Sequence, residues 1–294
     1  MWRDLKLFWR ISRPLNVLIS WLAFAVACFL VHGHSLSFLA DPPFWGTALV
    51  IVVIAAAGYW VNDVYDFRID RINRPGRTVV NAMLSVKKVL TAYFLANLGI
   101  ILFSLSYLGL YLGRYHITFI NVVSVLLLFI YASWLKRVSV AGNLVIAFLI
   151  ALVLFLAYYL YDAINLSLVW AIMFAFEITF IREITKDVQD IEGDLQYGLR
   201  TLPIQVGMRG TQRVLLALYT LFLLSCYLPF VEAHWRHGEW LWRYLSLSVL
   251  LVQLPTLYLI RMMWKSTEPT HFGMQSNMLK VLMLTGLVTL FFLR

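Results

Sequence analysis

The sequence predicts an all-α membrane protein with nine transmembrane helices, arranged as two four-helix repeats and a ninth helix in a single domain. Of its 294 residues, 62% are hydrophobic and 13% are charged, whereas a soluble domain has about 25% charged residues. The charges form clusters, and the tracts between them are about 20 residues long, the length of a bilayer-spanning helix. A third observation, an aspartate pattern that occurs twice along the chain, indicates an internal repeat.

The neutral tracts define the helices. No Asp, Glu, Lys or Arg occurs in residues 14–40, 42–62, 89–113, 115–135 and 138–161. Division at the charge clusters predicts spans over residues 15–33, 44–62, 89–110, 116–135, 140–161, 164–182, 211–230, 241–261 and 274–293. The single domain 1–294 then comprises a first repeat (1–135), a second repeat (140–261) and a ninth helix (274–293). Spans of this length exclude an outer-membrane barrel, whose strands have about 10 residues.

Composition also excludes several other classes. The formal charge of +9 does not indicate nucleic-acid binding, because the basic residues lie between hydrophobic spans and not on one face of a soluble domain. Cys28 and Cys226 lie far apart within apolar spans, so neither a disulfide framework nor a metal-binding CxxC site is predicted. The first span lacks a small-x-small cleavage site and further spans follow it, so we expect it to be retained and not cleaved as a signal peptide. No protein partner is inferred.

Basic residues set the orientation of the chain, because cytoplasmic loops carry an excess of Lys and Arg. When alternate loops are assigned to one side, that side receives 20 of the 24 basic residues, and the other side keeps Arg114, Arg236, Arg243 and Arg294. We therefore expect a protein of the cytoplasmic membrane with its N-terminus and active site in the cytoplasm and its C-terminus outside. Residues 2–13 mix Trp and Phe with four basic residues, which is typical of a helix lying on an anionic leaflet.

Two acidic segments on the predicted cytoplasmic side share one spacing. Residues 63–70 read DVYDFRID and residues 187–194 read DVQDIEGD, so each places Asp at positions i, i+3 and i+7. An Arg-Thr pair follows each segment, at residues 77–78 and 200–201, and the segments are 187 − 63 = 124 residues apart. On a helix these three positions share one narrow face.

Carboxylates this close repel one another and lie near the membrane boundary, where unpaired charge is costly. A divalent cation would offset them, and all-oxygen ligands without Cys or His favour Mg²⁺ or Mn²⁺ over zinc. Because Mg²⁺ completes its shell with water and substrate phosphate, a phosphate-bearing substrate is implied. Basic residues interleaved with these acids would stabilise the negative charge of a diphosphate leaving group. They are Arg68, Arg71, Arg74, Arg77, Lys136, Arg137, Arg182, Lys186 and Arg200. The alternative to a metal site is that each acidic cluster is a solvated loop whose acids pair with nearby arginines, for instance Asp66 or Asp70 with Arg74.

These segments resemble the signatures of the UbiA superfamily of intramembrane prenyltransferases, which carry an NDxxDxxxD segment after the second span and a second aspartate-rich segment after the sixth. The resemblance extends over essentially the whole chain. Arg13-Pro14 and Asn16 resemble the family's first segment, and residues 131–136 with Gly142-Asn143 resemble its Tyr-Lys segment. Residues 182–204 are most similar to the branch that contains digeranylgeranylglyceryl phosphate synthase.

The resemblance implies a central cavity in which the two motifs face each other and hold two Mg²⁺ ions, with Mn²⁺ as a substitute. The implied metal ligands are Asn62, Asp63, Asp66, Asp70, Asp187, Asp190 and Asp194. The implied diphosphate ligands are Asn16, Arg77, Lys136, Lys186 and Arg200. Asp66, Asp190, Tyr131 and Lys136 would act in catalysis, which ionises an allylic C–O bond and passes the prenyl cation to an acceptor.

The implied substrates are a polyprenyl diphosphate donor and a hydrophobic acceptor, with membrane lipids surrounding the protein. A lipid acceptor similar to geranylgeranylglyceryl phosphate is favoured, and an aromatic quinone precursor is second. Tyr131 is favoured for stabilising the cation through its π face, whereas Tyr59, Trp60, Tyr93 and Trp134 are more simply packing or interfacial residues.

Other interpretations remain open. Glu177, inside the sixth predicted span, could orient the acceptor or pair with a basic side chain. The His32/His34 and His234/His237 pairs have no carboxylate at ligand spacing, so no metal site is expected there. An intramembrane terpene cyclase would use the same ionisation without a second substrate. A secondary transporter would instead place its charges near the bilayer midplane on broken helices.

Overall fold

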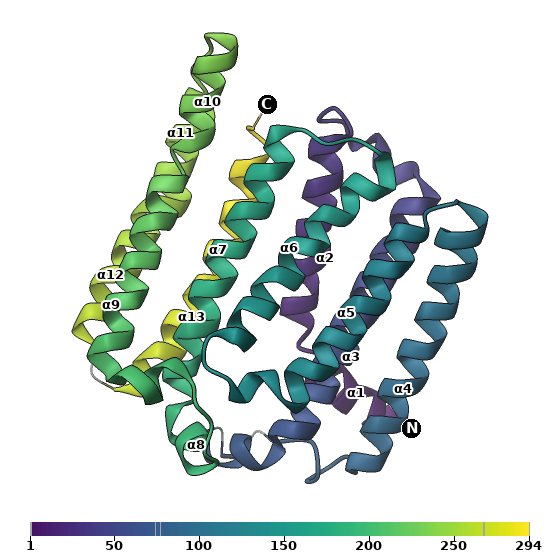
Figure 1. Ribbon diagram of the computed structural model, residues 1–294, viewed down its shortest axis with the longest axis vertical. Helices are drawn as coiled ribbons and strands as arrows, with labels where there is room; N and C mark the ends of the chain where they lie inside the picture. The colour runs from purple at the N-terminus through teal and green to yellow at the C-terminus, as the bar shows by residue number, and fades with distance from the viewer. Residues whose placement is uncertain (1, 74, 77, 267, 294) are drawn as a thin grey trace.

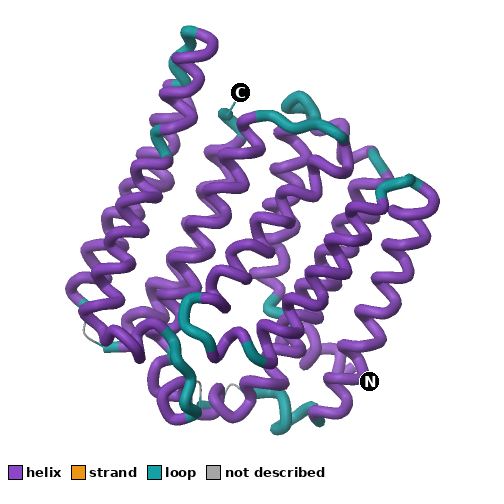
Figure 2. The backbone as a smooth tube through the Cα atoms, viewed as in Figure 1, coloured by secondary structure: helices purple, strands orange, loops and turns teal. Residues whose placement is uncertain are grey.

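The computed structural model describes residues 2–73, 75–76, 78–266 and 268–293, and these form a bundle of long helices (Figure 1, Figure 2). The helices, in chain order, are α1 (Trp2–Ile11), α2 (Pro14–Val31), η1 (Leu36–Ala40), α3 (Pro42–Asn73), α4 (Val86–Phe103), η2 (Ser104–Tyr111), α5 (Tyr115–Ser133), η3 (Leu135–Arg137), α6 (Ala141–Tyr161), α7 (Leu166–Gln189), α8 (Ile191–Gln196), α9 (Leu202–Ser225), α10 (Leu228–His237), α11 (Trp242–Ser248), η4 (Val249–Gln253), α12 (Leu254–Lys265) and α13 (Pro269–Leu290).

The helices account for the apolar composition. Within the described chain, seven helical segments are long and apolar enough to cross a membrane: Pro14–Val31, Pro42–Asn73, Val86–Tyr111, Tyr115–Ser133, Ala141–Tyr161, Leu202–His237 and Trp242–Lys265. The all-α membrane class predicted from composition is therefore confirmed. The two other predicted spans, 164–182 and 274–293, are helical over residues 166–182 and 274–290, in α7 and α13, but polar side chains such as Glu177 and Asn277 make these helices less apolar.

The two ends of the bundle are packed differently. At the end that carries the C-terminus (Figure 1), a hydrophobic core joins α2, α3, α6 and α7 through side chains such as Phe24, Phe44, Leu154 and Leu168. Phe24 and Phe44 stack with their ring centroids 5.5 Å apart. Both motifs lie toward the other end, which we call the aspartate end and which also carries α1 and α8 (Figure 1). Because this core fills the end that carries the C-terminus, we expect cavities in the bundle at the aspartate end.

Helix α2 is central to that end of the bundle, because it packs against α3, α6, α7 and α13. It begins directly after Arg13, whose left-handed backbone (φ 50°) separates it from α1. The helix predicted over residues 2–13 thus ends at Ile11. The turn points Arg13 toward α3, where its guanidinium bonds Asp63 and lies 4.9 Å from the centre of the Tyr59 ring.

Candidate active site

The first aspartate motif lies on one uninterrupted helix, as its spacing predicts, because α3 continues past the apolar span to Asn73. Arg13 donates a 2.7 Å hydrogen bond to Asp63. Asp66 is buried, with 4% of its surface exposed. It accepts a 2.6 Å hydrogen bond from the amide nitrogen of Asn62 and forms an ion pair with Lys136. The amide oxygen of Asn62 is therefore the atom of that side chain suited to a cation.

The second motif departs from the prediction that its three carboxylates share one face of a single helix. Helix α7 ends at Gln189, Asp190 forms the turn with a ψ of 8°, and Asp194 lies on the short helix α8. The backbone N–H of Asp194 still bonds the carbonyl of Asp190, whereas the N–H of Gly193 bonds a side chain of α3. Asp187 accepts a 2.8 Å hydrogen bond from Asn143 on α6, and it is close enough to Asp194 for the two carboxylates to interact.

Lys136 connects the two motifs electrostatically. It lies on η3, forms the ion pair with Asp66, and is close enough to Asp194 for the two charges to interact. Although burial disfavours its charge, the Asp66 carboxylate raises the pKa of Lys136 above its usual range. Gly142 lets α6 approach this segment, since a Cβ there would lie 3.1 Å from both the Leu135 carbonyl oxygen and the Tyr131 ring.

A direct backbone contact also joins the motifs. The side-chain oxygen of Asn73, at the end of α3, accepts a 2.8 Å hydrogen bond from the backbone N–H of Gly193 on α8. A Cβ at position 193 would lie only 2.7 Å from the Asn73 side chain, which is closer than packed atoms approach. A side chain at position 193 would therefore displace the Asn73 side chain, and glycine lets α3 and α8 meet at this hydrogen bond.

Gly193→Ala should therefore displace α8. We expect a loss of about 1–3 kcal/mol in stability from overpacking, and a fall in catalytic activity of about 10²-fold, the size of effect that a displacement of about 1 Å can cause. Thermal unfolding and product formation measure the two effects. The double variant Gly193→Ala/Asn73→Ala removes the clash, so it should regain stability. Unchanged stability of the single variant would contradict this account of the contact.

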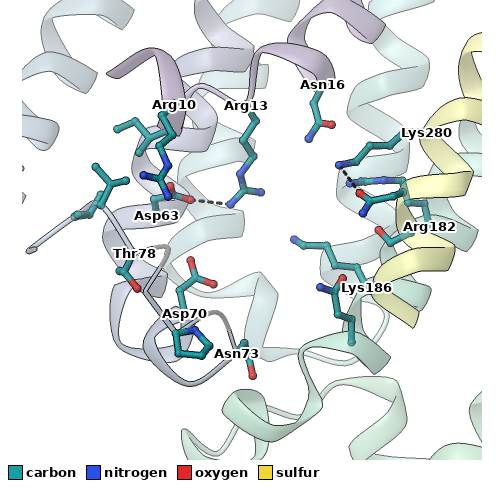
Figure 3. Close-up of a pocket in the computed structure, with 18 residues that line it drawn as sticks. Arg10, Arg13, Asn16, Asp63, Asp70, Asn73, Thr78, Arg182, Lys186 and Lys280 are labelled. Carbon is teal, nitrogen blue, oxygen red and sulfur yellow. Dashed lines mark hydrogen bonds and ion pairs between the residues drawn. The ribbon is translucent and has the colours of Figure 1, made fainter. Parts of the chain in front are cut away.

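A polar cavity of about 590 Å³ lies at the aspartate end, between α3 on one side and α7 and α13 on the other (Figure 3). Asp63 and Asp70 face it from α3. Three cations, Arg182, Lys186 and Lys280, face it from the opposite side, and Arg10 and Arg13 also line it (Figure 3). The basic residues outnumber the acids among the described lining residues, so the cavity suits an anion.

An apolar cavity of about 170 Å³ continues from the polar one into the bundle. Five described residues line both cavities and form what we call the junction: Arg13, Asn16, Arg182, Lys186 and Lys280. Beyond the junction, the walls are mainly Ile, Leu, Val and Ala, with Asn62 and Tyr131 also in the lining. A smaller apolar cavity of about 70 Å³ lies further along and shares Ile19 and Ala23 with the second. This succession of one polar and two apolar cavities suits a molecule with an anionic head and a long apolar tail.

The structure brings most of the predicted site residues together and separates some. Asn16, Lys186 and Tyr131 line cavities as expected, whereas Lys136 pairs with Asp66. Arg200 is exposed and lines none of the three cavities; its backbone N–H bonds the Arg137 carbonyl. Arg77, a predicted diphosphate ligand, lies outside the described residues. Glu177 accepts a 2.7 Å hydrogen bond from Ser225 on α9, not from a basic side chain.

Sequence reasoning missed Arg10 and Lys280, which the fold brings to the cavity from the first and last helices. A lone basic residue in the otherwise neutral stretch 274–293 was the available signal for Lys280. It also missed Glu183, a buried acid in the apolar cavity. The signal there was a carboxylate next to the cluster of Arg182 and Lys186.

The residues present fit a divalent cation that also binds substrate oxygens. One carboxylate oxygen of Asp194 is buried without a hydrogen-bond partner, and burial raises the pKa of this group to about 7 against the opposing effect of Lys136. Within the described ranges, no three His, Cys, Asp or Glu side chains gather closely enough to hold a metal by themselves. Pairs such as Asn62/Asp66 and Asp190/Asp194 instead match Mg²⁺, which binds one or two carboxylates and takes its other ligands from water and phosphate.

Such a site, in a helical bundle that crosses the membrane, defines an enzyme that acts on an amphipathic anion inside the bilayer. The chain belongs to the UbiA prenyltransferase family, which it matches over residues 19–279. It is thus a prenyltransferase by family.

Similar proteins and solved structures agree with this assignment to the family. The chain is 31% identical over 242 residues to digeranylgeranylglyceryl phosphate synthase from Methanoregula boonei, which covers 80% of this chain and 79% of that protein. It is 31% identical over 233 residues to the synthase of the same name from Thermococcus sibiricus, covering 77% of each. A solved structure described as digeranylgeranylglyceryl phosphate synthase in membranes has a similar fold, with a TM-score of 0.70, 22% identity and 98% of both chains covered. A UbiA homolog from Archaeoglobus fulgidus bound to GPP and Mg²⁺ has a TM-score of 0.63 and 16% identity, over 97% of this chain and 99% of that one.

Proposed function

We propose that the protein transfers a polyprenyl group from a prenyl diphosphate to a lipid acceptor similar to geranylgeranylglyceryl phosphate, with an aromatic quinone precursor as the second choice of acceptor. The observation that carries this proposal is the junction, where cations stand between a polar cavity and an apolar one. The names of the relatives favour the lipid acceptor. In this proposal the diphosphate occupies the junction and the isoprenoid tail occupies the apolar cavities.

The aspartate motifs would hold Mg²⁺, the ion bound to the Archaeoglobus homolog. Asn62, Asp63 and Asp66 would bind one ion, and Asp190 and Asp194 a second, with Asp70 and Asp187 as direct or water-mediated ligands and Mn²⁺ as a substitute. The bound metal supplies Lewis-acid stabilisation of the departing diphosphate. The orphaned oxygen of Asp194 and the amide oxygen of Asn62 support this arrangement.

The protein's own residues would prepare the ionisation of the allylic C–O bond. Arg13, Lys186 and Lys280, together with Asn16, are placed to bind the diphosphate oxygens and stabilise the negative charge that grows on them. The allylic cation would form beside the Tyr131 ring, whose π face attracts positive charge. The apolar walls beyond the junction exclude water, which would otherwise consume the cation.

We also propose nine transmembrane helices, in two four-helix repeats (1–135 and 140–261) followed by a ninth helix within 274–293. The equivalent positions of the motifs, at the ends of α3 and α7, support the repeat. Termini at opposite ends of the bundle (Figure 1) suit an odd number of spans. The basic residues would place the N-terminus and the aspartate end in the cytoplasm and the C-terminus outside the cytoplasmic membrane.

Purified protein with Mg²⁺, radiolabelled farnesyl or geranylgeranyl diphosphate and candidate acceptors tests the proposal. We expect an ether-linked lipid, identified by mass spectrometry, that depends on both substrates. An isoprenoid hydrocarbon formed from the diphosphate alone would instead indicate a cyclase. Diphosphate that stays intact with every acceptor would refute prenyl transfer.

Ala23 provides a test of where the tail lies, because it lines both apolar cavities. Ala23→Phe should block the passage between them, so we expect transfer from a C20 donor to fall at least tenfold relative to a C10 donor, at a stability cost of about 1–3 kcal/mol. The measurement is kcat/KM for the two donors. Leu18→Phe, on the exposed face of the same helix, is the matched control. If the ratio of kcat/KM for the C20 and C10 donors were unchanged in Ala23→Phe, the isoprenoid tail would not pass Ala23.

A further inference from the structure

Glu183 occupies a distinctive position in the site. It lies on α7, one turn before Asp187, with its side chain only 10% exposed. Among the described residues that line the apolar cavity, it is the one acid; the other charged residues there are Arg13, Arg182, Lys186 and Lys280. A buried carboxylate where cations meet apolar walls calls for a functional explanation, since burying a charge is costly unless it is compensated.

The surroundings keep this carboxylate charged and in place. Arg182 donates a 2.5 Å hydrogen bond to its Oε1 atom. Lys186 lies one turn further along α7, and Tyr131, which lines the same cavity from α5, is close enough to interact electrostatically. Glu183 is thus an ionised acid beside the aromatic ring next to which the proposed allylic cation forms.

The proposed chemistry needs such a group. When a hydroxyl oxygen captures an allylic cation, a new C–O bond forms and the oxygen carries one proton too many. Some base must accept that proton near the reacting carbon. Asp66, Asp190 and Asp194 line none of the three cavities, and Asp63 and Asp70 line only the polar one.

We propose that Glu183 is the catalytic base for the acceptor, an inference that rests on the proposed prenyl transfer. The allylic C–O bond of the donor breaks with its electron pair leaving on the diphosphate. The acceptor hydroxyl oxygen then bonds to the allylic carbon, and its proton passes to the Glu183 carboxylate. The acceptor is accordingly an alcohol that enters with its hydroxyl between Glu183 and Tyr131.

Glu183→Gln tests this role, with Glu177→Gln as the matched control. Glu177 lies on the same helix, bonds Ser225 and lines none of the three cavities. Each protein is incubated with Mg²⁺, geranylgeranyl diphosphate and geranylgeranylglyceryl phosphate, and released diphosphate and ether lipid are measured separately. Stabilisation of each protein by the donor, measured as a shift in Tm, reports donor binding.

In Glu183→Gln we expect the yield of ether lipid to fall about 10²-fold or more, the usual size of a general-base contribution. Diphosphate release and the donor-induced Tm shift should persist. The prenyl cation should then be captured by water, so that prenol accumulates. Glu183→Asp, which keeps a carboxylate, should form more ether lipid than Glu183→Gln. Glu177→Gln should keep the wild-type ratio of ether lipid to released diphosphate.

Two results would overturn the inference. Equal loss of ether lipid, diphosphate release and the donor-induced Tm shift in Glu183→Gln would make Glu183 a counter-charge that positions Arg182 and Lys186. An unchanged ratio of ether lipid to diphosphate would show that another group takes the proton. Both results leave prenyl transfer by the wild type intact. A wild type that forms no ether lipid refutes the proposed function itself, and the role of Glu183 with it.

Discussion

Asp190→Ala is expected to reduce prenyl transfer by about 10³-fold or more while leaving the fold intact. The loss follows from its proposed role as a metal ligand, because electrostatic stabilisation of a leaving group contributes several kcal/mol and each 1.36 kcal/mol is about tenfold in rate. Alanine retains the backbone N–H that bonds the Lys186 carbonyl, so the turn between α7 and α8 should keep its geometry. Product formation and thermal unfolding, each with and without Mg²⁺, measure the two effects.

Asp162→Asn is the control for this variant. Asp162 pairs with Arg114 and 68% of its side chain is exposed, and asparagine tolerates the left-handed backbone at this position (φ 49°), so the change should cost less than about 1 kcal/mol and leave transfer unchanged. If Asp190→Ala retained transfer, the second motif would not hold a catalytic metal.

Lys136→Met is expected to have the largest effect on stability. Lys136 and Asp66 form a buried ion pair, with side-chain exposures of 15% and 6%. Removing one partner of such a pair costs about 3–5 kcal/mol, because the other charge stays buried without compensation. Added Mg²⁺ should offset part of this loss at the carboxylate, so the metal should raise the Tm of Lys136→Met more than that of the wild type.

The double variant Asp66→Asn/Lys136→Met separates the charge effect from a packing effect. It has no unpaired charge at this position, so we expect it to recover most of the lost stability without recovering transfer. If Lys136→Met unfolded at the same temperature as the wild type in the absence of metal, the ion pair would not contribute to stability.

The sequence predicts the helices well and the site in part, for physical reasons. Helices 14–31 and 141–161 agree closely with the predicted spans 15–33 and 140–161, since a run of apolar residues allows little else in a membrane. The motif over residues 63–70 lies on one helix because nothing in its sequence interrupts the helical pattern. The bend at Asp190 depends on packing of α8 against α3, which local spacing does not encode.

The same reasoning explains the residues that were missed. Periodicity within one segment assigns a residue to a face of its own helix but does not say which distant helix lies opposite. Lys280 is separated from the first motif by about two thirds of the chain, and only the packing of α13 against α2 and α7 brings it to the junction. Glu183 was hidden for another reason, since its surroundings and not its spacing distinguish it from an ordinary partner of Arg182.

The contact between Asn73 and Gly193 has a consequence for biosynthesis. Its two residues are 120 positions apart in the chain, so the ribosome completes the first motif long before the partner of Asn73 exists. Until α7 and α8 have emerged, Asp66 has no second motif beside it, and the wall that α13 contributes to the cavity is made last of all. The first half of the chain therefore carries one motif yet only part of the site, and the enzyme becomes functional only at a late stage of membrane insertion.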